Sequence, residues 1–410
     1  MKKTIAVVML MITVNLFATN GDNMIGVTPS SSALGGTGVG AGVGATDQIF
    51  RNPAFLINYQ GFNMSFGAVL FFPEVKGRYY DIQHGDSGMI KSKADTFMVP
   101  EIGITYQINE KLAFGLGAFG VSGMGVDYRN RDPRLSNMNT NFQFMRTIAA
   151  LSYKINENWS IGAGIDLAWG SLDIGTYFQD VNSGTPYEAG GGVSQSFGCG
   201  GQFGIAFQKE NISIGILYQT SIPMNYDDVL DTNNDGVFEK MKLEQPDELA
   251  GGFGYTLENW RILFDIRWIG WEKTDGYGDF NWKDQTVYAL GVEYSLNSKT
   301  ILKLGYNYAK TPIRSKENTD VLNHNNHIPE LASSFSNFAV DWFNLIGFPA
   351  ISESHYSLGI TYRFNKTFGI DFGFVYSPAK RIKVIAVNNI AEVEASNKQY
   401  SFAFGLKWHF

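Results

Sequence analysis

Apolar and polar residues alternate one by one through most of this chain, in segments of about ten residues separated by polar turns. In the last segment one side carries apolar residues: Tyr400, Phe402, Phe404, Leu406, Trp408 and Phe410. The other side carries small or polar residues: Ser401, Ala403, Gly405, Lys407 and His409. A period of two is that of a β-strand, so the pattern predicts an all-β fold. No uninterrupted apolar run of about 18 residues, the length that a membrane-spanning helix needs, follows Ala18.

A turn phrase, an aromatic residue followed by a short polar stretch, recurs six times between residues 106 and 367. Its polar residues favour turns, and its aromatic residue is typical of a membrane interface. Six hairpins with one strand added at each end give about fourteen antiparallel strands. We expect them at 62–72, 97–107, 112–122, 146–155, 159–172, 196–208, 211–220, 248–256, 260–271, 286–296, 300–309, 355–364, 367–377 and 400–410. Short turns on one side and longer connections on the other predict a transmembrane antiparallel β-barrel.

The first 18 residues have the features of a secretory signal peptide: Lys2 and Lys3, an apolar stretch at 5–17, and Ala18 at the cleavage point. Alternation alone would also fit a soluble two-layer sandwich. The signal peptide, the unequal connections and the terminal Phe410 together exclude that alternative. We therefore expect a barrel in the outer membrane of a Gram-negative bacterium, with both termini in the periplasm. The net charge of −7 argues against nucleic acid as a partner.

Residues 19–60 do not alternate, and they are rich in glycine and other small residues. They could form a flexible leader. The apolar residues Phe50, Phe55 and Leu56 around Asn52-Pro53-Ala54 are anchors that a leader does not need. We therefore divide the chain into a signal peptide at 1–18, a plug at 19–60 that fills the lumen, and a barrel at 61–410.

At these residues the chain resembles a known family. The matching residues of the plug are Ser32, Gly35, Gly38, Gly40, Asp47, Asn52, Pro53, Ala54 and Leu56, and a second match covers 245–313. They resemble the FadL/TodX family of outer-membrane transporters for long-chain fatty acids and hydrophobic compounds. The resemblance implies a fourteen-stranded barrel and a hatch that closes the lumen and moves when ligand binds. It also implies an internal ligand site and a side opening at the third strand. The hatch residues carried over are Arg51, Asn52, Pro53, Ala54, Phe55 and Leu56.

The third expected strand contains five glycines: Gly115, Gly117, Gly120, Gly123 and Gly125. Glycine weakens a strand and permits bulges, and unpaired backbone groups are not tolerated against lipid. We therefore expect a kink or wall gap near 117–123, through which an apolar ligand leaves sideways. The alternative is that the glycines only make room for the hatch or for bulky groups in the lumen.

Ten charged residues fall on the expected lumen side of the strands: Glu101, Arg146, Asp166, Asp265, Arg267, Glu293, Lys303, Arg363, Asp371 and Lys407. They either pair and brace the interior, or one or two of the cations bind a ligand carboxylate. The cations that we expect nearest a ligand are Lys283, Lys303 and Arg363. In the longest outer loop Phe338 and Trp342 lie at helical spacing. They would either pack on the barrel rim or catch apolar substrate.

Asp231, Asn233, Asp235 and Glu239 match the opening of a calcium loop, with glycine at the sixth position. Lys242 stands where the closing glutamate is expected, so the loop either binds calcium or is an acidic solvated loop. No other cofactor is expected. No nucleophile elbow, phosphate loop or zinc signature occurs, and Ser354 and His355 would point to opposite faces of a strand, so we expect no enzyme.

These observations favour a passive uptake channel for fatty acids or for aromatic and aliphatic hydrocarbons, gated by the hatch. The expected partners are the hydrophobic small molecule, outer-membrane lipid, and the barrel-insertion machinery, which recognises a terminal aromatic residue such as Phe410. We expect a monomer. The alternative is a non-transport barrel of the same family that serves surface-protein assembly or adhesion, and a general porin is the third reading.

Overall fold

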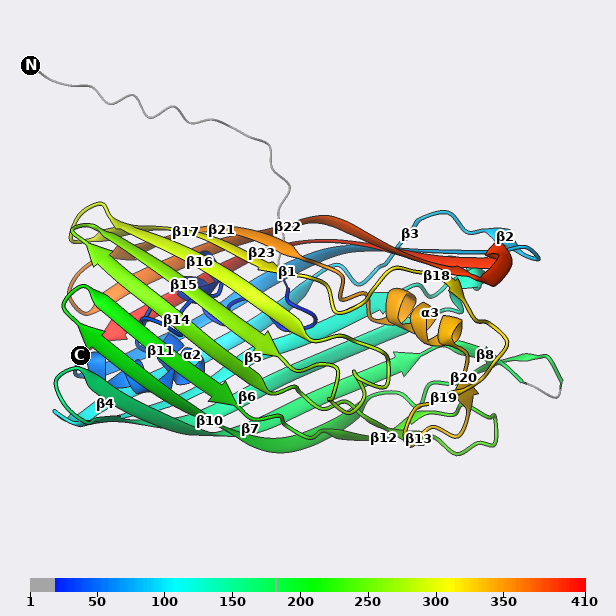
Figure 1. Ribbon diagram of the computed structural model, residues 1–410, viewed down its shortest axis with the longest axis horizontal. Helices are drawn as coiled ribbons and strands as arrows, with labels where there is room; N and C mark the ends of the chain where they lie inside the picture. The colour runs from blue at the N-terminus through cyan, green and yellow to red at the C-terminus, as the bar shows by residue number, and fades with distance from the viewer. Residues whose placement is uncertain (1–18, 181–182) are drawn as a thin grey trace, which may run out of the picture.

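The computed structural model describes residues 19–180 and 183–410, and the expected signal peptide lies outside them. Fourteen antiparallel strands form one closed barrel (Figure 1). They are β1 (Phe62–Asp81), β4 (Phe97–Asn109), β5 (Leu112–Asp127), β6 (Asn139–Lys154), β7 (Trp159–Gly175), β10 (Ser194–Lys209), β11 (Ile212–Gln219), β14 (Glu248–Leu257), β15 (Trp260–Ile269), β16 (Gln285–Ser295), β17 (Thr300–Ala309), β21 (Ser354–Arg363), β22 (Phe368–Ala386) and β23 (Ala391–His409). Each strand pairs with the next, and β23 closes on β1 from Asn63–His409 to Asp81–Ala391. The fold class predicted from the alternation is confirmed.

Short turns and the C-terminal Phe410 lie at one end of the barrel, called here the short-turn end (Figure 1). The opposite, long-loop end carries the smaller elements. They are β2 (Gly85–Asp86), β3 (Ile90–Lys91), η2 (Pro133–Leu135), β8 (Tyr177–Gln179), β9 (Pro186–Glu188), β12 (Asn225–Leu230), β13 (Glu239–Lys242), β18 (Lys316–Thr319), β19 (Asn326–His327), β20 (Ser334–Phe335), α3 (Asn337–Gly347) and η3 (Val387–Asn389). None of the helices in the described ranges is both long and apolar enough to cross a membrane.

Several strands are longer than we expected, and the largest extensions are those of β1, β22 and β23, which continue past the long-loop end of their neighbours (Figure 1). The expected bounds 367–377 and 400–410 were too short because the apolar residues change from the outer to the inner face there while backbone pairing continues. Ile382, Val384 and Val393 are buried, whereas the outer face carries cross-strand ion pairs such as Lys383–Glu392 (2.5 Å) and Lys398–Glu74 (3.3 Å). Charged pairs of this kind suit strands that have left the hydrophobic layer.

The two faces of the wall differ as the alternation predicts. On β23 the side chains of Phe402 and Phe404 point outward, and Phe404 is 49% exposed, whereas Ser401 is 2% exposed. The same contrast holds between Phe264, which is exposed, and its neighbour Asp265, which is buried. An apolar exterior with a polar interior is the arrangement of a barrel that lies in lipid.

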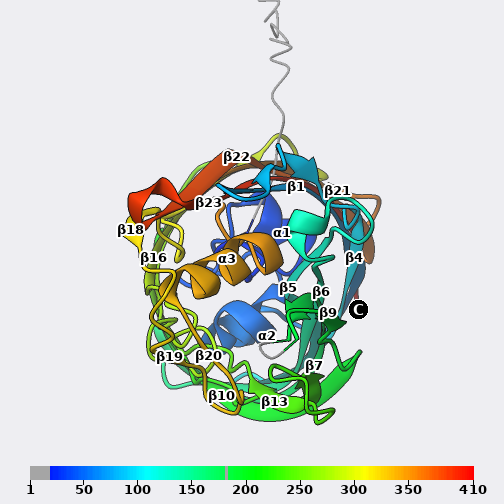
Figure 2. The ribbon, with the colours of Figure 1, turned by 90° about the vertical axis from the view of Figure 1, so that its right-hand side faces the viewer.

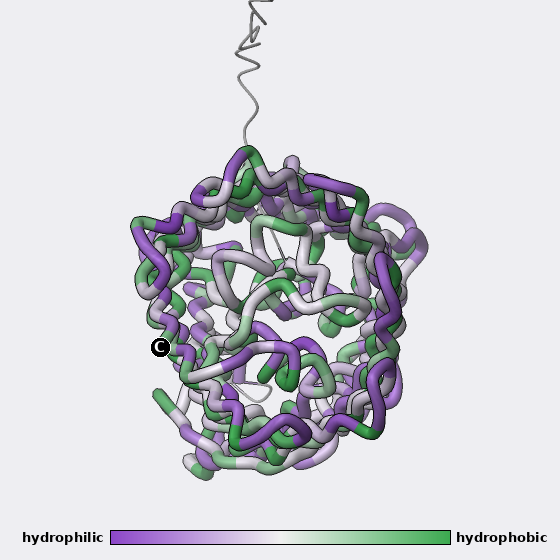
Figure 3. Tube along the Cα trace, turned by 90° about the vertical axis from the view of Figure 1, so that its left-hand side faces the viewer, coloured by the Kyte–Doolittle hydropathy of each residue, from purple (hydrophilic) through white to green (hydrophobic). Residues whose placement is uncertain are grey.

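Residues 19–60 lie inside the barrel, where they form α1 (Pro29–Ala33), α2 (Asp47–Arg51) and η1 (Pro53–Asn58) (Figures 2 and 3). We call this segment the hatch. Local sequence explains its short helices: Thr28 caps α1 through the backbone N–H of Ser31, and Asn52 caps η1 through the N–H of Ala54. Leu34, Ile49 and Leu56 are fully buried between the hatch and the wall or within the hatch.

Glycines of the wall allow the hatch to approach it closely. On most strands there is a glycine whose added Cβ would meet hatch atoms: Gly103, Gly115, Gly162, Gly204, Gly215, Gly252, Gly291, Gly305, Gly359, Gly373 and Gly405. We call this set the glycine belt. It explains much of the glycine content of the chain, since backbone of the hatch lies directly against backbone of the wall. Gly115, one of the glycines expected at a side opening, belongs to the belt because it faces Ile49 and Leu56.

Two adjacent glycines of β14 test the belt. A Cβ on Gly252 would overlap the backbone of Gly40 and the carboxylate of Asp265, whereas a Cβ on Gly251 would meet nothing within 4 Å. We expect Gly252→Ala to lower stability by about 1–3 kcal/mol, the usual cost of overpacking, and to expose the hatch to protease. Gly251→Ala is the matched control and should unfold at the wild-type temperature. Equal unfolding temperatures and equal protease resistance for the two variants would contradict the role of the belt.

Candidate functional site

A buried aspartate of the wall holds the middle of the hatch. Asp265 on β15 accepts three hydrogen bonds from consecutive backbone N–H groups, those of Gly38 (2.7 Å), Val39 (2.9 Å) and Gly40 (3.1 Å). Bonds from N–H groups to a carboxylate are among the stronger ones in proteins. Gly38 has a positive φ of 145°, a conformation that turns these N–H groups together toward the carboxylate. Asp265 therefore fixes the glycine-rich stretch against the wall.

A second anchor surrounds Ser30 of α1. Its hydroxyl oxygen accepts hydrogen bonds from the ammonium groups of Lys303 (2.6 Å) and Lys407 (2.8 Å), and it donates one to Asp371. Lys407 also forms an ion pair with Asp371, and Lys303 lies 3.8 Å from the same carboxylate. These charges hold the hatch and neutralise one another, so Lys303 is engaged with the protein itself.

Most other lumen charges are paired as well. Arg146 pairs with Asp166, and two further ion pairs join Arg261 to Glu293 (2.8 Å) and Arg267 to Glu248 (3.4 Å). The first of the two readings of these charges, a paired network that braces the interior, is therefore the one that the contacts support.

The three cations expected near a ligand do not come together. Lys283 lies in a loop at the long-loop end, where its ammonium is 2.5 Å from Glu272. Lys303 and Arg363 both line a cavity of about 420 Å³ at the short-turn end, between the hatch and the wall. The expected strands already imply this separation, because Lys303 and Arg363 lie beside short turns whereas Lys283 lies in a longer connection.

The Asn-Pro-Ala turn is bonded to another part of the hatch through Val39 and to the wall through Ser152 and Ser160. The side chain of Asn52 donates to the carbonyl of Val39 (3.0 Å), and the carbonyl of Ala54 accepts from the hydroxyls of Ser152 (2.9 Å) and Ser160 (2.7 Å). The neighbouring Phe55 and Leu56 are buried. Arg51 donates to the carbonyl of Ile25 inside the hatch, and its burial lowers the pKa of its guanidinium to about 9.

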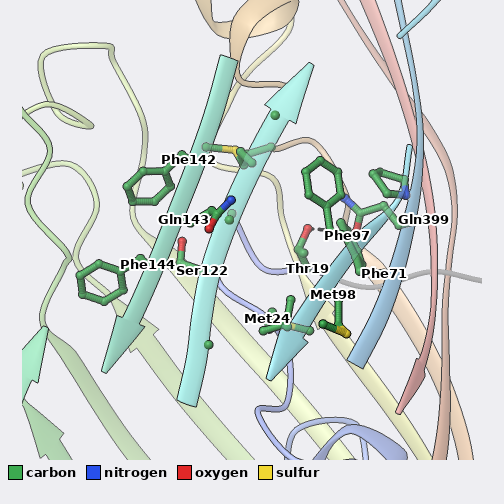
Figure 4. Close-up of a pocket in the computed structure, with 18 of the residues that line it drawn as sticks. Thr19, Met24, Phe71, Phe97, Met98, Ser122, Phe142, Gln143, Phe144 and Gln399 are labelled. Atoms are coloured by element: carbon green, nitrogen blue, oxygen red, sulfur yellow. Dashed lines mark hydrogen bonds between the residues drawn. The ribbon is translucent and has the colours of Figure 1, made fainter. Parts of the chain in front are cut away.

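An apolar cavity of about 310 Å³ lies between the start of the hatch and the wall (Figure 4). Its aromatic and methionine lining consists of Phe71, Phe97, Phe142, Phe144, Met24, Met98, Met124 and Met145. Its polar lining is uncharged: Thr19, Thr96, Ser122, Gln143, Asn397 and Gln399. None of the described residues that line it carries a charge. A concave apolar site with a few polar groups is the usual form of a small-molecule site.

The wall is incomplete beside this cavity. Pairing between β4 and β5 ends at Glu101–Phe119, although β4 continues along β1 to Phe97 and β5 continues along β6 to Asp127. A register shift between Gly120 and Ser122 marks a bulge in β5. The interruption begins within the range 117–123 that the glycines of this strand indicated and continues to Asp127.

The first part of the hatch occupies the edge of β5 that β4 leaves free. The N–H of Met24 donates to the carbonyl of Val121 (2.9 Å), the N–H of Gly123 donates to the carbonyl of Asp22 (3.3 Å), and Asn23 forms a bridge with Ser122. We call residues 20–24 the inner strand. The side chain of Asp22 accepts a hydrogen bond from the hydroxyl of Tyr277, and burial raises its pKa to about 6.

Sequence reasoning missed the cavity residues. One signal was available in the sequence, because the apolar residues of β6 change from the outer to the inner face near the long-loop end. There Phe142 and Phe144 face inward and are buried, while Gln143 between them is exposed. An apolar inner face on a strand whose outer face has become polar indicates an internal apolar site.

Helix α3 lies inside the long-loop mouth of the barrel (Figure 2). Phe338 is buried and Trp342 is half-buried, and Asn344 of the same helix joins Trp282 (2.9 Å) and the carbonyl of Phe280 (2.7 Å) by hydrogen bonds. Neither Phe338 nor Trp342 lines the apolar cavity. Of the two readings of this loop, packing on the barrel is the one that its contacts favour.

The candidate calcium residues lie in the loop between β12 and β13. Asp231 accepts backbone hydrogen bonds from Asn234 (2.7 Å) and Gly236 (2.9 Å), and Glu239 accepts from the hydroxyl of Thr232 (3.0 Å). Within the described ranges no group of three or more histidine, cysteine, aspartate or glutamate residues is placed to hold a metal ion. Calcium binding therefore stays a prediction.

The anchor at Asp265 leads to a prediction about closure of the lumen. In Asp265→Asn an amide NH2 group replaces one carboxylate oxygen, and this group cannot accept hydrogen bonds from the N–H groups that it faces. The variant should therefore lose about 1.5–3 kcal/mol of folding free energy for each hydrogen bond broken. We expect the middle of the hatch to loosen and ion conductance in planar bilayers to rise. Glu293→Gln on the neighbouring β16 is the control, because Glu293 pairs with Arg261 of the wall. Wild-type conductance in Asp265→Asn would show that this anchor does not keep the lumen closed.

Comparisons with known proteins agree with this architecture. A long-chain fatty acid transport protein of Escherichia coli O6:H1 is 21% identical over 438 residues, covering 93% of this chain and 92% of that protein. Outer membrane protein P1 of Haemophilus influenzae is 20% identical over 332 residues, covering 72% of this chain and 69% of that protein.

Solved structures share the fold. A Pseudomonas aeruginosa FadL homologue has a TM-score of 0.71 at 15% identity, over 97% of this chain and 100% of that one. The Pseudomonas putida toluene transporter TodX has a TM-score of 0.68 at 19% identity, over 94% and 99%. The model of the family described as "Outer membrane protein transport protein (OMPP1/FadL/TodX)" matches residues 19–323. The chain is therefore a member of the OMPP1/FadL/TodX family of outer-membrane transport proteins.

Proposed function

We propose that this protein is a passive uptake channel for hydrophobic molecules, either long-chain fatty acids or aromatic and aliphatic hydrocarbons. The observation that carries the proposal is the apolar cavity placed directly against an interruption of the wall. Relatives named as fatty acid transporters and fold neighbours named as toluene transporters support the same class of ligand. An apolar solute that moves down its concentration gradient needs a route through the polar outer leaflet but no energy source.

The lining of the cavity suits the apolar part of such a ligand. Phe97, Phe142 and Phe144 offer flat apolar surfaces, and the methionine side chains adapt to ligands of different shape. An open cavity of about 310 Å³ also favours transport over a purely structural barrel.

The proposed exit is sideways, between β4 and β5 and into the membrane. Backbone groups without a strand partner are tolerated at membrane depth only where they face protein or a cavity. Beyond the Glu101–Phe119 pair the edge of β5 faces the inner strand and the cavity. Met98, which also lines the cavity, is 69% exposed on the outer surface of β4. These positions support the proposed path from the cavity to lipid.

The proposed gate is the inner strand, and the rest of the hatch stays in place. Residues 28–54 are held by Asp265, by Lys303 and Lys407, by the serines at Ala54 and by the glycine belt. The inner strand has far fewer bonds, mainly those to Val121, Gly123 and Tyr277. Its displacement would uncover the edge of β5 at a lower cost than moving the whole hatch. In the same proposal the short-turn end and the C-terminus lie in the periplasm, whereas Thr19, where we expected a periplasmic N-terminus, lies inside the barrel.

A disulfide across the gap tests the exit. A Cβ built on Gly120 lies 3.5 Å from the Cβ of Val99, which is within the range for a disulfide. Val99→Cys with Gly120→Cys, in a Cys199→Ser background, should stop uptake of fatty acid or hydrocarbon while ligand still binds. Reduction of the disulfide should restore uptake. Full uptake with the crosslink shown to be closed would rule out the sideways route.

A second disulfide tests the gate. Asn23 and Ser122 are directly opposed across an antiparallel bridge, so their replacement by cysteine should allow a bond. In Cys199→Ser background this crosslink fixes the inner strand on β5, and we expect uptake to fall in the oxidised protein only. If oxidised and reduced proteins transport equally, the inner strand does not gate the route.

A further inference from the structure

The first residue that the structure describes, Thr19, lies in the apolar cavity and is only 4% exposed (Figure 4). Its backbone nitrogen donates a hydrogen bond to Nε2 of His355 (2.9 Å). Its hydroxyl donates to Oε1 of Gln399 (3.0 Å). Two buried acceptors from strands β21 and β23 therefore hold the start of the hatch in one place.

The ring of His355 is arranged to accept that bond. Asn307 uses its amide nitrogen to donate to the carbonyl of Gly35 (2.9 Å), which leaves its oxygen 3.2 Å from Nδ1 of His355. Nδ1 therefore carries the proton, and Nε2 offers its lone pair to the nitrogen of Thr19. The sequence predicts signal-peptide cleavage after Ala18, and cleavage at that bond would turn this same nitrogen into an α-ammonium group.

An ammonium at this position would have no counter-charge in the cavity, because no carboxylate is among the described residues that line it, and the carboxyl group of the nearby Asp22 accepts a hydrogen bond from Tyr277 instead. An unpaired charge away from water is costly, so the group favours a ligand that brings a negative charge. We propose that the α-ammonium of mature Thr19 is the cation that binds the carboxylate of a fatty acid whose chain fills the cavity. The inference rests on the proposed function and narrows its substrate class to apolar carboxylates.

The nearest arginines are less available to such a ligand. Arg51, Arg146 and Arg267 line a separate space of about 30 Å³, which shares Met24 and Phe144 with the apolar cavity. Arg146 and Arg267 are also engaged in the ion pairs with Asp166 and Glu248 described above. The nitrogen of Thr19, in contrast, lies in the lining of the cavity itself.

The test moves the charge two residues away from the nitrogen of Thr19 and keeps the hydrogen bond of that nitrogen. A Thr-Gln pair inserted between Ala18 and Thr19 preserves the Ala-Thr junction for cleavage, and it turns the nitrogen of Thr19 back into an amide that can still donate to His355. Intact mass spectrometry would locate the mature N-terminus of both proteins. Binding of dodecanoate and of dodecanol, which have the same chain length, would then be measured on each protein in nanodiscs.

We expect the insertion to weaken dodecanoate binding by about tenfold and to leave dodecanol binding unchanged, which also shows that the cavity is intact. Unchanged dodecanoate binding would overturn the inference and place the carboxylate elsewhere, for example at the arginines. Equal weakening of dodecanoate and dodecanol binding would overturn the inference as well. So would a mass showing that the mature wild-type protein does not begin at Thr19. If native protein binds neither ligand, the proposed function itself fails, and that result is distinct from a selective loss.

Discussion

The structure depends on the need to pair every backbone N–H and C=O group that lies at membrane depth. Lipid offers no hydrogen bonds, so the barrel meets this need by closing β23 on β1 along their whole length. The one interruption that we describe, between β4 and β5, is covered from inside by the inner strand and bordered by the cavity. A defect in the wall and a plug in the lumen are thus parts of one arrangement, because neither satisfies its backbone groups alone.

The charged groups buried in the interior also need partners. Asp265 and Asp371 would be costly to bury in an empty apolar lumen, and the hatch supplies the N–H groups of Gly38 to Gly40 and the hydroxyl of Ser30 that stabilise them. The glycines of the belt have no side chain, so they leave room at the wall where the hatch approaches it. Residues 28–54 are therefore built into the wall by many contacts, whereas the inner strand is held mainly by its bonds to Val121, Gly123 and Tyr277. That contrast in anchoring is the physical basis for placing mobility in the inner strand.

Particular residues show why some features could be predicted and others could not. The strand at 260–271 was predictable because Ile262, Phe264 and Ile266 alternate with charges, and lipid on one side and a polar lumen on the other impose that pattern. The extension of β22 to Ala386 was not, because outside the hydrophobic layer the apolar residues, such as Ile382 and Val384, lie on the inner face and no longer on the outer one. The expected strands place Lys283 in a long connection and Lys303 beside a short turn, but only the structure shows that Lys283 pairs with Glu272 and that Lys303 holds Ser30.

The sequence by itself determined the all-β class, the number of strands, the two faces of the wall, the presence of a plug-like segment and the family resemblance. Each of these features can be read from a short stretch of residues, because it depends on the pattern within a single strand, turn or segment. Tertiary structure alone decided the cavity, which joins Thr19, Phe97, Phe142 and Gln399 from four distant parts of the chain. It also decided which charges meet and where the ladder of β4 and β5 ends. Such contacts follow from barrel closure and strand register, and a pattern with period two carries no information about which residues face one another across the lumen.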